Sequence, residues 1–214
     1  MGLTDLAAGR LKEEIFQIVD RDGALLFRDT GIDSPVRYAE FLDSIDFHHH
    51  SYMGGTAPRT DLGRGVYTAT DLPADTTVMV HQEMAYLDNA PDYISFYSHK
   101  PPENGQKTHL LADARMLAER LPAEIRERYR GKHARLRRTL APAGSASVLS
   151  RREKSWQEVL GTDDRTEAVA IGEQKNWELR WTDDDYLIIV QEPARFFRPH
   201  PLHGEIWCNP ALAF

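Results

Sequence analysis

The chain has 214 residues, of which 41% are hydrophobic and 28% are charged, a balance typical of a globular protein with its own core. Its formal net charge of −7 argues against nucleic acid or an anionic membrane surface as the main partner. The sequence shows no membrane-spanning apolar run, no secretory signal pattern and a single cysteine, Cys208, so we expect one cytoplasmic domain over residues 1–214.

Helices and strands are expected to alternate through the first half of the chain. Apolar residues at helical intervals predict a helix over 11–20, and Ser34 before Pro35 predicts the cap and first residue of a second helix. Ala24–Phe27 is typical of a buried strand. Further strands are expected where β-branched and aromatic residues lie between turn signals, over 65–70, 76–84 and 91–98.

The second half is expected to begin with helices and to end with strands. The helices cover 110–121, 123–129, 155–160 and 162–170, with Met116 and Leu117 facing inward and Thr162 capping the last helix. No clear pattern runs through 132–150. A hairpin joins 177–181 to 185–191, and a short strand lies within 199–208. These elements predict an α+β class, mainly β, and a strand that carries metal ligands suits a jelly roll.

The most informative motif follows the β-branched residues of the strand expected over 76–84. His81 and Glu83 are two residues apart, so an extended backbone directs both side chains to one face. An imidazole and a carboxylate are two of the three ligands in the 2-His-1-carboxylate site of non-haem Fe(II). Taken alone, the pair is more typical of an ion pair or of a polar surface on a half-exposed strand.

Other groups of polar residues have simpler interpretations. The run His48–His50 is assigned to a loop, because three successive side chains cannot all reach one ion from a regular backbone. His200 and His203 flank a turn, and either is a candidate for a third ligand. The arginines between 126 and 138 cover several faces of a helix and indicate a solvated surface. Cys208 is expected to be buried and unreactive.

Several blocks of sequence, taken in order, carry a family resemblance. They are Ala57–Thr60, Val66–Thr68, His81–Leu87, Ile94–Tyr97, Gly105–Thr108, Ala112–Arg115, Ser155–Thr162 and His200–Asn209. Together they resemble the taurine dioxygenase-like family of Fe(II)/2-oxoglutarate-dependent oxygenases. The nearest branch is the clavaminate synthase-like one, which has Glu rather than Asp after the first histidine. The likeness covers nearly the whole chain.

The resemblance implies a fold, a reaction and a set of site residues. The fold is a double-stranded β-helix, or jelly roll, with flanking helices. The reaction uses Fe(II), 2-oxoglutarate and O2 to hydroxylate a small molecule, or to oxidise its C–H bond in a related way. By resemblance, His81 and Glu83 are metal ligands, Thr108 contacts the carboxylate of 2-oxoglutarate, and Arg59 lines the substrate pocket. Glu83 argues against halogenation, for which the family has a small residue there.

The sequence also departs from the family pattern. Gln106 replaces a glycine of the family's Gly-Gly-x-Thr motif, and one extra residue separates Thr108 from Asp113. The family's second iron-binding histidine, and the arginine that pairs with the far carboxylate of 2-oxoglutarate, are expected beyond Phe214. The resemblance therefore implies a fold that is incomplete at the C-terminus, completed by a homo-oligomer or a complementing chain.

Two alternatives to this oxygenase stay open. The chain is then either an incomplete, non-catalytic relative that acts as a binding or partner subunit, or a metal-dependent isomerase or hydrolase with a cupin-like fold. The second alternative uses His81 and Glu83 with a different third ligand, such as His200 or His203.

Overall fold

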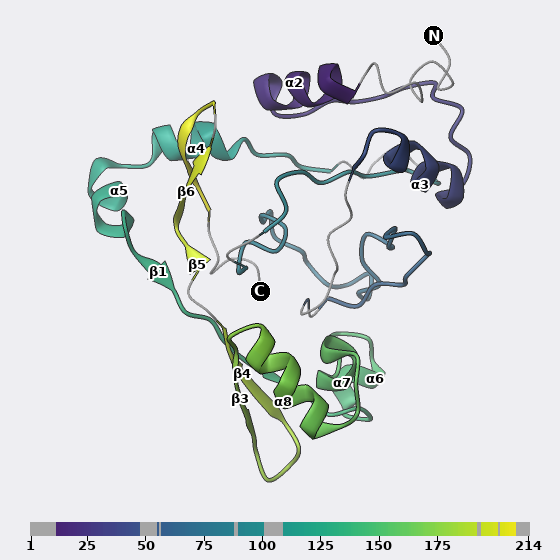
Figure 1. The fold of residues 1–214 in the computed structure, drawn as a ribbon, viewed down its shortest axis with the longest axis vertical. Coiled ribbons are helices and arrows are strands. Elements are labelled where there is room, and N and C mark those ends of the chain that lie inside the picture. The colour runs from purple at the N-terminus through teal and green to yellow at the C-terminus, as the bar shows by residue number, and fades with distance from the viewer. Residues whose placement is uncertain are drawn as a thin grey trace. The chain divides into compact units, whose positions relative to one another are not determined.

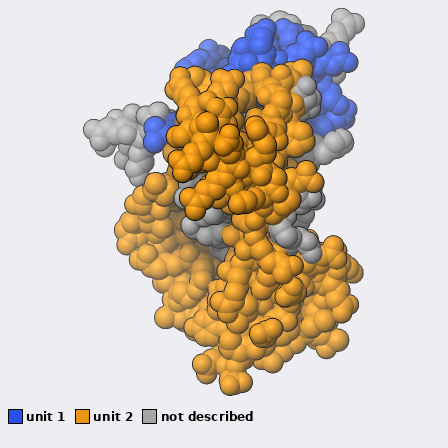
Figure 2. Space-filling view, turned by 90° about the vertical axis from the view of Figure 1, so that its left-hand side faces the viewer, with its two compact units in different colours: residues 1–51, 60–69, 95–110 blue, residues 52–59, 70–94, 111–214 orange. Residues whose placement is uncertain are grey.

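The computed structural model describes residues 12–47, 55, 57–87, 90–100, 109–191, 194–200 and 202–208. The chain forms two compact units, shown in Figure 2: residues 1–51, 60–69 and 95–110 make the first, and residues 52–59, 70–94 and 111–214 make the second. The single domain expected over 1–214 stays a prediction. In the part of the chain described, no helix has the length and apolar character needed to cross a membrane.

The described residues of the first unit form the helices α2 (Lys12–Asp22) and α3 (Pro35–Ser44). Ser34 caps α3 by accepting a hydrogen bond from the Arg37 backbone N–H, and Pro35 occupies the first turn, where its missing N–H costs nothing. The buried face of α3 packs its tyrosine, alanine and leucine against Val66. This small apolar core holds the unit together.

The second unit contains a three-stranded antiparallel sheet in the order β2–β4–β3. Its strands are β2 (Arg137–Leu140), β3 (Glu178–Trp181) and β4 (Leu187–Val190). Three helices follow β2 along the chain: α6 (Ala146–Leu149), α7 (Trp156–Leu160) and α8 (Arg165–Gln174). α8 lies along the β3–β4 hairpin (Figure 1). Trp156 of α7 and Leu187 and Ile189 of β4 are almost fully buried in the core between these elements.

The described residues of the second unit also form α4 (Ala114–Arg120), α5 (Ala123–Tyr129), β1 (His133–Ala134), β5 (Ala194–Arg195), β6 (Phe197–His200) and β7 (Gly204–Trp207). β1 pairs with β5 and β6 pairs with β7, both antiparallel. α4 packs against β7, where Ala118 meets Phe197 and Trp207 in a second apolar cluster.

Most of the expected helices are confirmed, as is the hairpin. The helix expected over 123–129 matches α5, and that over 155–160 matches α7 with its Ser155 cap. The expected cap Thr162 is wrong, because Asp164 caps α8 instead. Met116 and Leu117 do not face inward, since both are exposed on the short helix α4. β1, β2 and α6 lie in the stretch 132–150 that showed no pattern.

The strands expected in the first half are mostly wrong. Ala24–Phe27 is not a buried strand, because Leu26 and Phe27 are exposed. Only one isolated bridge, Asp61 to Tyr67, forms in the region expected over 65–70, and no ladder forms over 91–98. An extended run becomes a strand only where another strand pairs with it. Among the described residues no such partner lies beside these segments.

The predicted fold class is therefore confirmed in its coarse form. The described residues form helices and small antiparallel sheets, as an α+β class requires. The expectation of a mainly β fold is not met, since helices occupy more of these residues than strands do. Within the described ranges the sheets do not close into a barrel.

Candidate functional site

His81 and Glu83 lie together in the second unit, as their spacing predicts. The Nε2 atom of His81 is 3.7 Å from Oε2 of Glu83. The two side chains are partly buried, at 33% and 19% exposed. One nitrogen and one oxygen donor therefore face the same small volume, and both remain accessible from solvent.

The imidazole of His81 is oriented by its own backbone neighbourhood. Its Nδ1 atom lies 2.7 Å from the carbonyl oxygen of Met79, which can only accept a hydrogen bond. Nδ1 therefore donates this hydrogen bond, and Nε2 is the ring nitrogen that lies near Glu83. A carbonyl that holds the far nitrogen is the usual companion of a metal-binding histidine.

The segment that carries the pair is not the strand expected over 76–84. Val78, Met79 and Val80 are exposed at 52%, 69% and 49%, and the described residues provide no strand beside them. After Gln82 the backbone turns, and Met84 adopts a positive φ of 52°. The face shared by His81 and Glu83 thus arises from an unpaired extended run that ends in a turn.

The intervening residue, Gln82, anchors the pair. Its side-chain amide donates a hydrogen bond of 2.8 Å to the backbone oxygen of Trp207, at the end of β7. Because alternate residues of an extended run point to opposite sides, Gln82 reaches the β6–β7 hairpin while its neighbours face away from it. Sequence reasoning missed this role, although the alternation itself was the available signal.

Arg59 contacts the proposed metal ligand directly. Its Nη2 atom donates to both carboxylate oxygens of Glu83, at 3.2 Å and 3.1 Å, and only 17% of the Arg59 side chain is exposed. Pro58 is almost fully buried, and its carbonyl accepts a 2.8 Å hydrogen bond from the backbone N–H of Asp71. The backbone before Arg59 is therefore held firmly.

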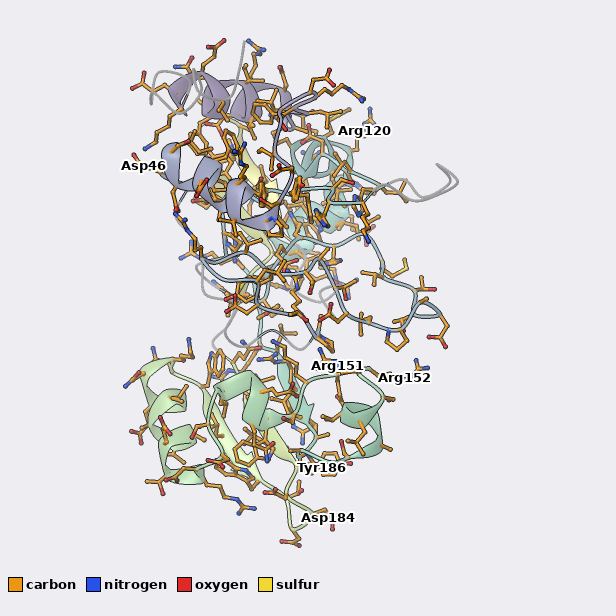
Figure 3. All side chains as sticks on the ribbon, turned by 90° about the vertical axis from the view of Figure 1, so that its right-hand side faces the viewer. Asp46, Arg120, Arg151, Arg152, Asp184 and Tyr186 are labelled. Atoms are coloured by element: carbon orange, nitrogen blue, oxygen red, sulfur yellow. The ribbon has the colours of Figure 1, made fainter. Side chains whose placement is uncertain are left out.

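A charged loop borders Arg59 and Glu83. Arg151 and Arg152, labelled in Figure 3, precede α7 and pair with Asp71 and Asp75 at 3.4 Å and 3.2 Å. Lys154 follows in the same loop. Burial lowers the pKa of its ammonium group; the nearby carboxylate of Glu158 raises that pKa, and the positive charges of Arg59 and Arg151 lower it. Arg59 thus has a second cation nearby.

The structure does not unite every predicted site residue. Thr108 and His48–His50 lie outside the described residues. Within the described ranges, no three His, Cys, Asp or Glu side chains converge as a metal site would require. His200 and His203 contact each other, with ring centroids 4.8 Å apart, so the described residues do not bring them to His81 and Glu83 as a third ligand.

His203 instead belongs to a polar cluster at the start of α4. Its Nε2 atom lies 3.0 Å from Nη1 of Arg115, whose guanidinium also donates to the carboxylate of Asp113 at 2.7 Å. These hydrogen bonds from Arg115 lower the pKa of Asp113 from 3.8 to about 2. The cluster joins α4 to the β6–β7 turn.

Two further expectations have definite outcomes. Cys208 is buried, as predicted, and burial raises the pKa of its thiol. The arginines between 126 and 138 are not all solvated, because Arg138 is buried. Its guanidinium lies 5.4 Å from the ring of Tyr86 and 5.8 Å from that of Trp177. The prediction failed there because β2, not a helix, carries this arginine.

The comparisons with known proteins confirm the family resemblance. Residues 2–204 match the family described as "Taurine catabolism dioxygenase TauD, TfdA family". The chain is 28% identical over 201 residues to the dapdiamide synthesis protein DdaC of Enterobacter agglomerans, covering 94% of the chain and 58% of that protein. It is 24% identical over 212 residues to a clavaminate synthase-like protein of Arabidopsis thaliana, covering 94% and 62%. The chain thus spans less than two thirds of either relative.

Proposed function

Because the chain belongs to the taurine catabolism dioxygenase TauD, TfdA family, we propose that it is an Fe(II)/2-oxoglutarate-dependent oxygenase acting on a C–H bond of a small molecule. The substrate class we favour is an amino acid or an intermediate of secondary metabolism. The jelly-roll fold of the family is part of this proposal. The observation that carries it is the placement of His81 Nε2 and Glu83 Oε2 on one side of the chain, 3.7 Å apart.

The donor set fits Fe(II). One imidazole nitrogen and one carboxylate oxygen are two members of the facial triad that such iron sites use. The hydrogen bond from Nδ1 to the Met79 carbonyl leaves Nε2 as the donor atom of His81. A third protein ligand belongs to the proposal, but no residue is assigned to it.

The residues of the chain would hold the reactants rather than perform the oxidation. When bound, Fe(II) and 2-oxoglutarate would supply the electrons that activate O2, the oxidant. His81 and Glu83 would hold the metal, and the negative charge of Glu83 would offset part of the metal's positive charge. Gln82 would keep both donors at fixed positions through its bond to Trp207. We assign the 2-oxoglutarate carboxylate to Thr108, and the substrate side of the metal to Arg59.

The test is an anaerobic titration with Fe(II) and 2-oxoglutarate, followed by exposure to O2. We expect a weak visible charge-transfer band on binding, and succinate after oxygen is admitted. If neither appears, even with candidate substrates present, the oxygenase proposal fails for this polypeptide.

Three single variants make the assignment specific. His81→Ala and Glu83→Ala should abolish the band, because each removes a donor atom. His200→Ala is the matched control and should retain the band, since His200 contacts His203 rather than the proposed site. Loss of metal binding in His200→Ala would favour the cupin-like isomerase or hydrolase instead.

A second candidate function is a non-catalytic binding or partner subunit. It is favoured by the observation that, within the described ranges, no third ligand converges on His81 and Glu83. The exposed apolar residues Val78–Val80 beside the pair are consistent with a homo-oligomer or a complementing chain. A chain that stays monomeric in solution, at 24.4 kDa, would argue against the partner-subunit role.

A further inference from the structure

The guanidinium of Arg59 is already hydrogen-bonded to the carboxylate of Glu83, which the proposed metal would need as a ligand. Arg59 donates from a single nitrogen to both oxygens of Glu83, including Oε2, the oxygen that faces His81. A divalent metal bound between His81 and Glu83 would therefore approach an oxygen that already carries an Arg59 hydrogen bond. The guanidinium and the metal would share one carboxylate.

This contact has the features of a built interaction rather than of a chance surface pair. The side chains of Arg59 and Glu83 are both more than four-fifths buried, so solvent screens their charges poorly. Lys154 adds a second positive charge close to Arg59. Glu158 and Asp71 interact with Lys154 as well and are paired with Arg151.

We propose that Arg59 is the built-in counter-ion of Glu83 and that it limits the affinity of the site for divalent metal. This inference rests on the proposed function, because it takes Glu83 to be a metal ligand. Arg59 is a positioning residue in this view, since it acts on the metal only through Glu83. In the metal-free chain it neutralises the carboxylate that faces His81.

The direction of the effect follows from two opposed contributions. Arg59 orders the Glu83 side chain, which favours metal binding, and it repels a dication at short range, which opposes binding. The ordering contribution is small here, because the backbone of Glu83 is already held by Gln82 on one side and by the buried turn residues Met84 and Ala85 on the other. Repulsion acts on a double charge in a poorly solvated place, so it dominates.

The experiment measures the dissociation constant of Co(II), a spectroscopic substitute for Fe(II), by its visible absorption under nitrogen. Arg59→Met keeps much of the side-chain length and removes the charge, so its dissociation constant should fall at least tenfold, which corresponds to about 1.4 kcal/mol. Arg59→Lys keeps the charge and should stay within about threefold of the original chain, since its ammonium group still repels the metal. An unchanged or larger constant in Arg59→Met overturns the inference.

Two additional variants separate the possible failures. Arg59→Gln, which retains a hydrogen-bond donor without charge, should also bind Co(II) more tightly, and it replaces Arg59→Met if that variant does not fold by circular dichroism. His81→Ala should lose Co(II) binding. If the original chain binds Co(II) through His81 and neither neutral variant binds more tightly, only the counter-ion inference fails. If no variant binds Co(II), the proposed function fails, and the inference fails with it.

Discussion

The carboxylate of Asp113 should stabilise the fold through its charge as well as through its capping hydrogen bond. It accepts bonds from the backbone N–H of Arg115 at 2.9 Å and from the Arg115 guanidinium at 2.7 Å and 2.8 Å. The pKa falls from 3.8 to about 2, which corresponds to about 2.5 kcal/mol at neutral pH. Since 28% of the side chain is exposed, solvent screening reduces this to about 1 to 2 kcal/mol.

Asp113→Asn tests this value, because asparagine still caps a helix but carries no charge. Urea unfolding at pH 7 should show a loss of about 1 to 2 kcal/mol, and Asp113→Ala should lose about 1 kcal/mol more with the cap. A folded pKa below the unfolded one gives stability that is present above about pH 4 and is lost as the pH falls toward 2. The difference in unfolding free energy between the original chain and the Asp113→Asn variant should therefore shrink over that range. Equal stability at pH 7, or a pH-independent difference, would refute the reasoning.

Three further substitutions or reactions test the packing of the second unit. Gly172→Ala should destabilise the fold by about 1 to 3 kcal/mol in denaturant unfolding, because the added Cβ would lie 2.4 Å from Cδ1 of Leu179. Adding Leu179→Ala should recover part of that loss. An unchanged unfolding midpoint in Gly172→Ala would contradict the close contact of α8 and β3. Ser155→Ala should lower the free energy of unfolding by about 1 kcal/mol, since Ser155 and Glu158 form the capping box of α7. A calorimetric melting temperature equal to that of the original chain would exclude this stabilising role of Ser155. Cys208 should react with a thiol reagent slowly in buffer and rapidly in denaturant, because the thiol is buried and its pKa is raised; rapid labelling of the folded chain would show that the β7 end is open.

The helices were the most predictable part of the fold, because their signals are local. Ser34 and Pro35 mark the start of α3 at adjacent positions, and Ser155 with Glu158 marks that of α7 within a single turn. The β3–β4 hairpin was predictable for the same reason, since its turn and both strands are contiguous. The strand expected over 76–84 failed, because a ladder needs a partner whose position no local pattern contains.

The sequence by itself determined the identity of the proposed ligands, their spacing and the family to which the chain belongs. Their two-residue separation brings His81 and Glu83 to one side, although no described strand pairs with the run that carries His81. Only the tertiary structure decided what surrounds them. Arg59 meets Glu83 across 24 positions of sequence, and Gln82 meets Trp207 across 125. Such contacts depend on how distant segments pack, and that packing places a cation on the carboxylate proposed to bind the metal.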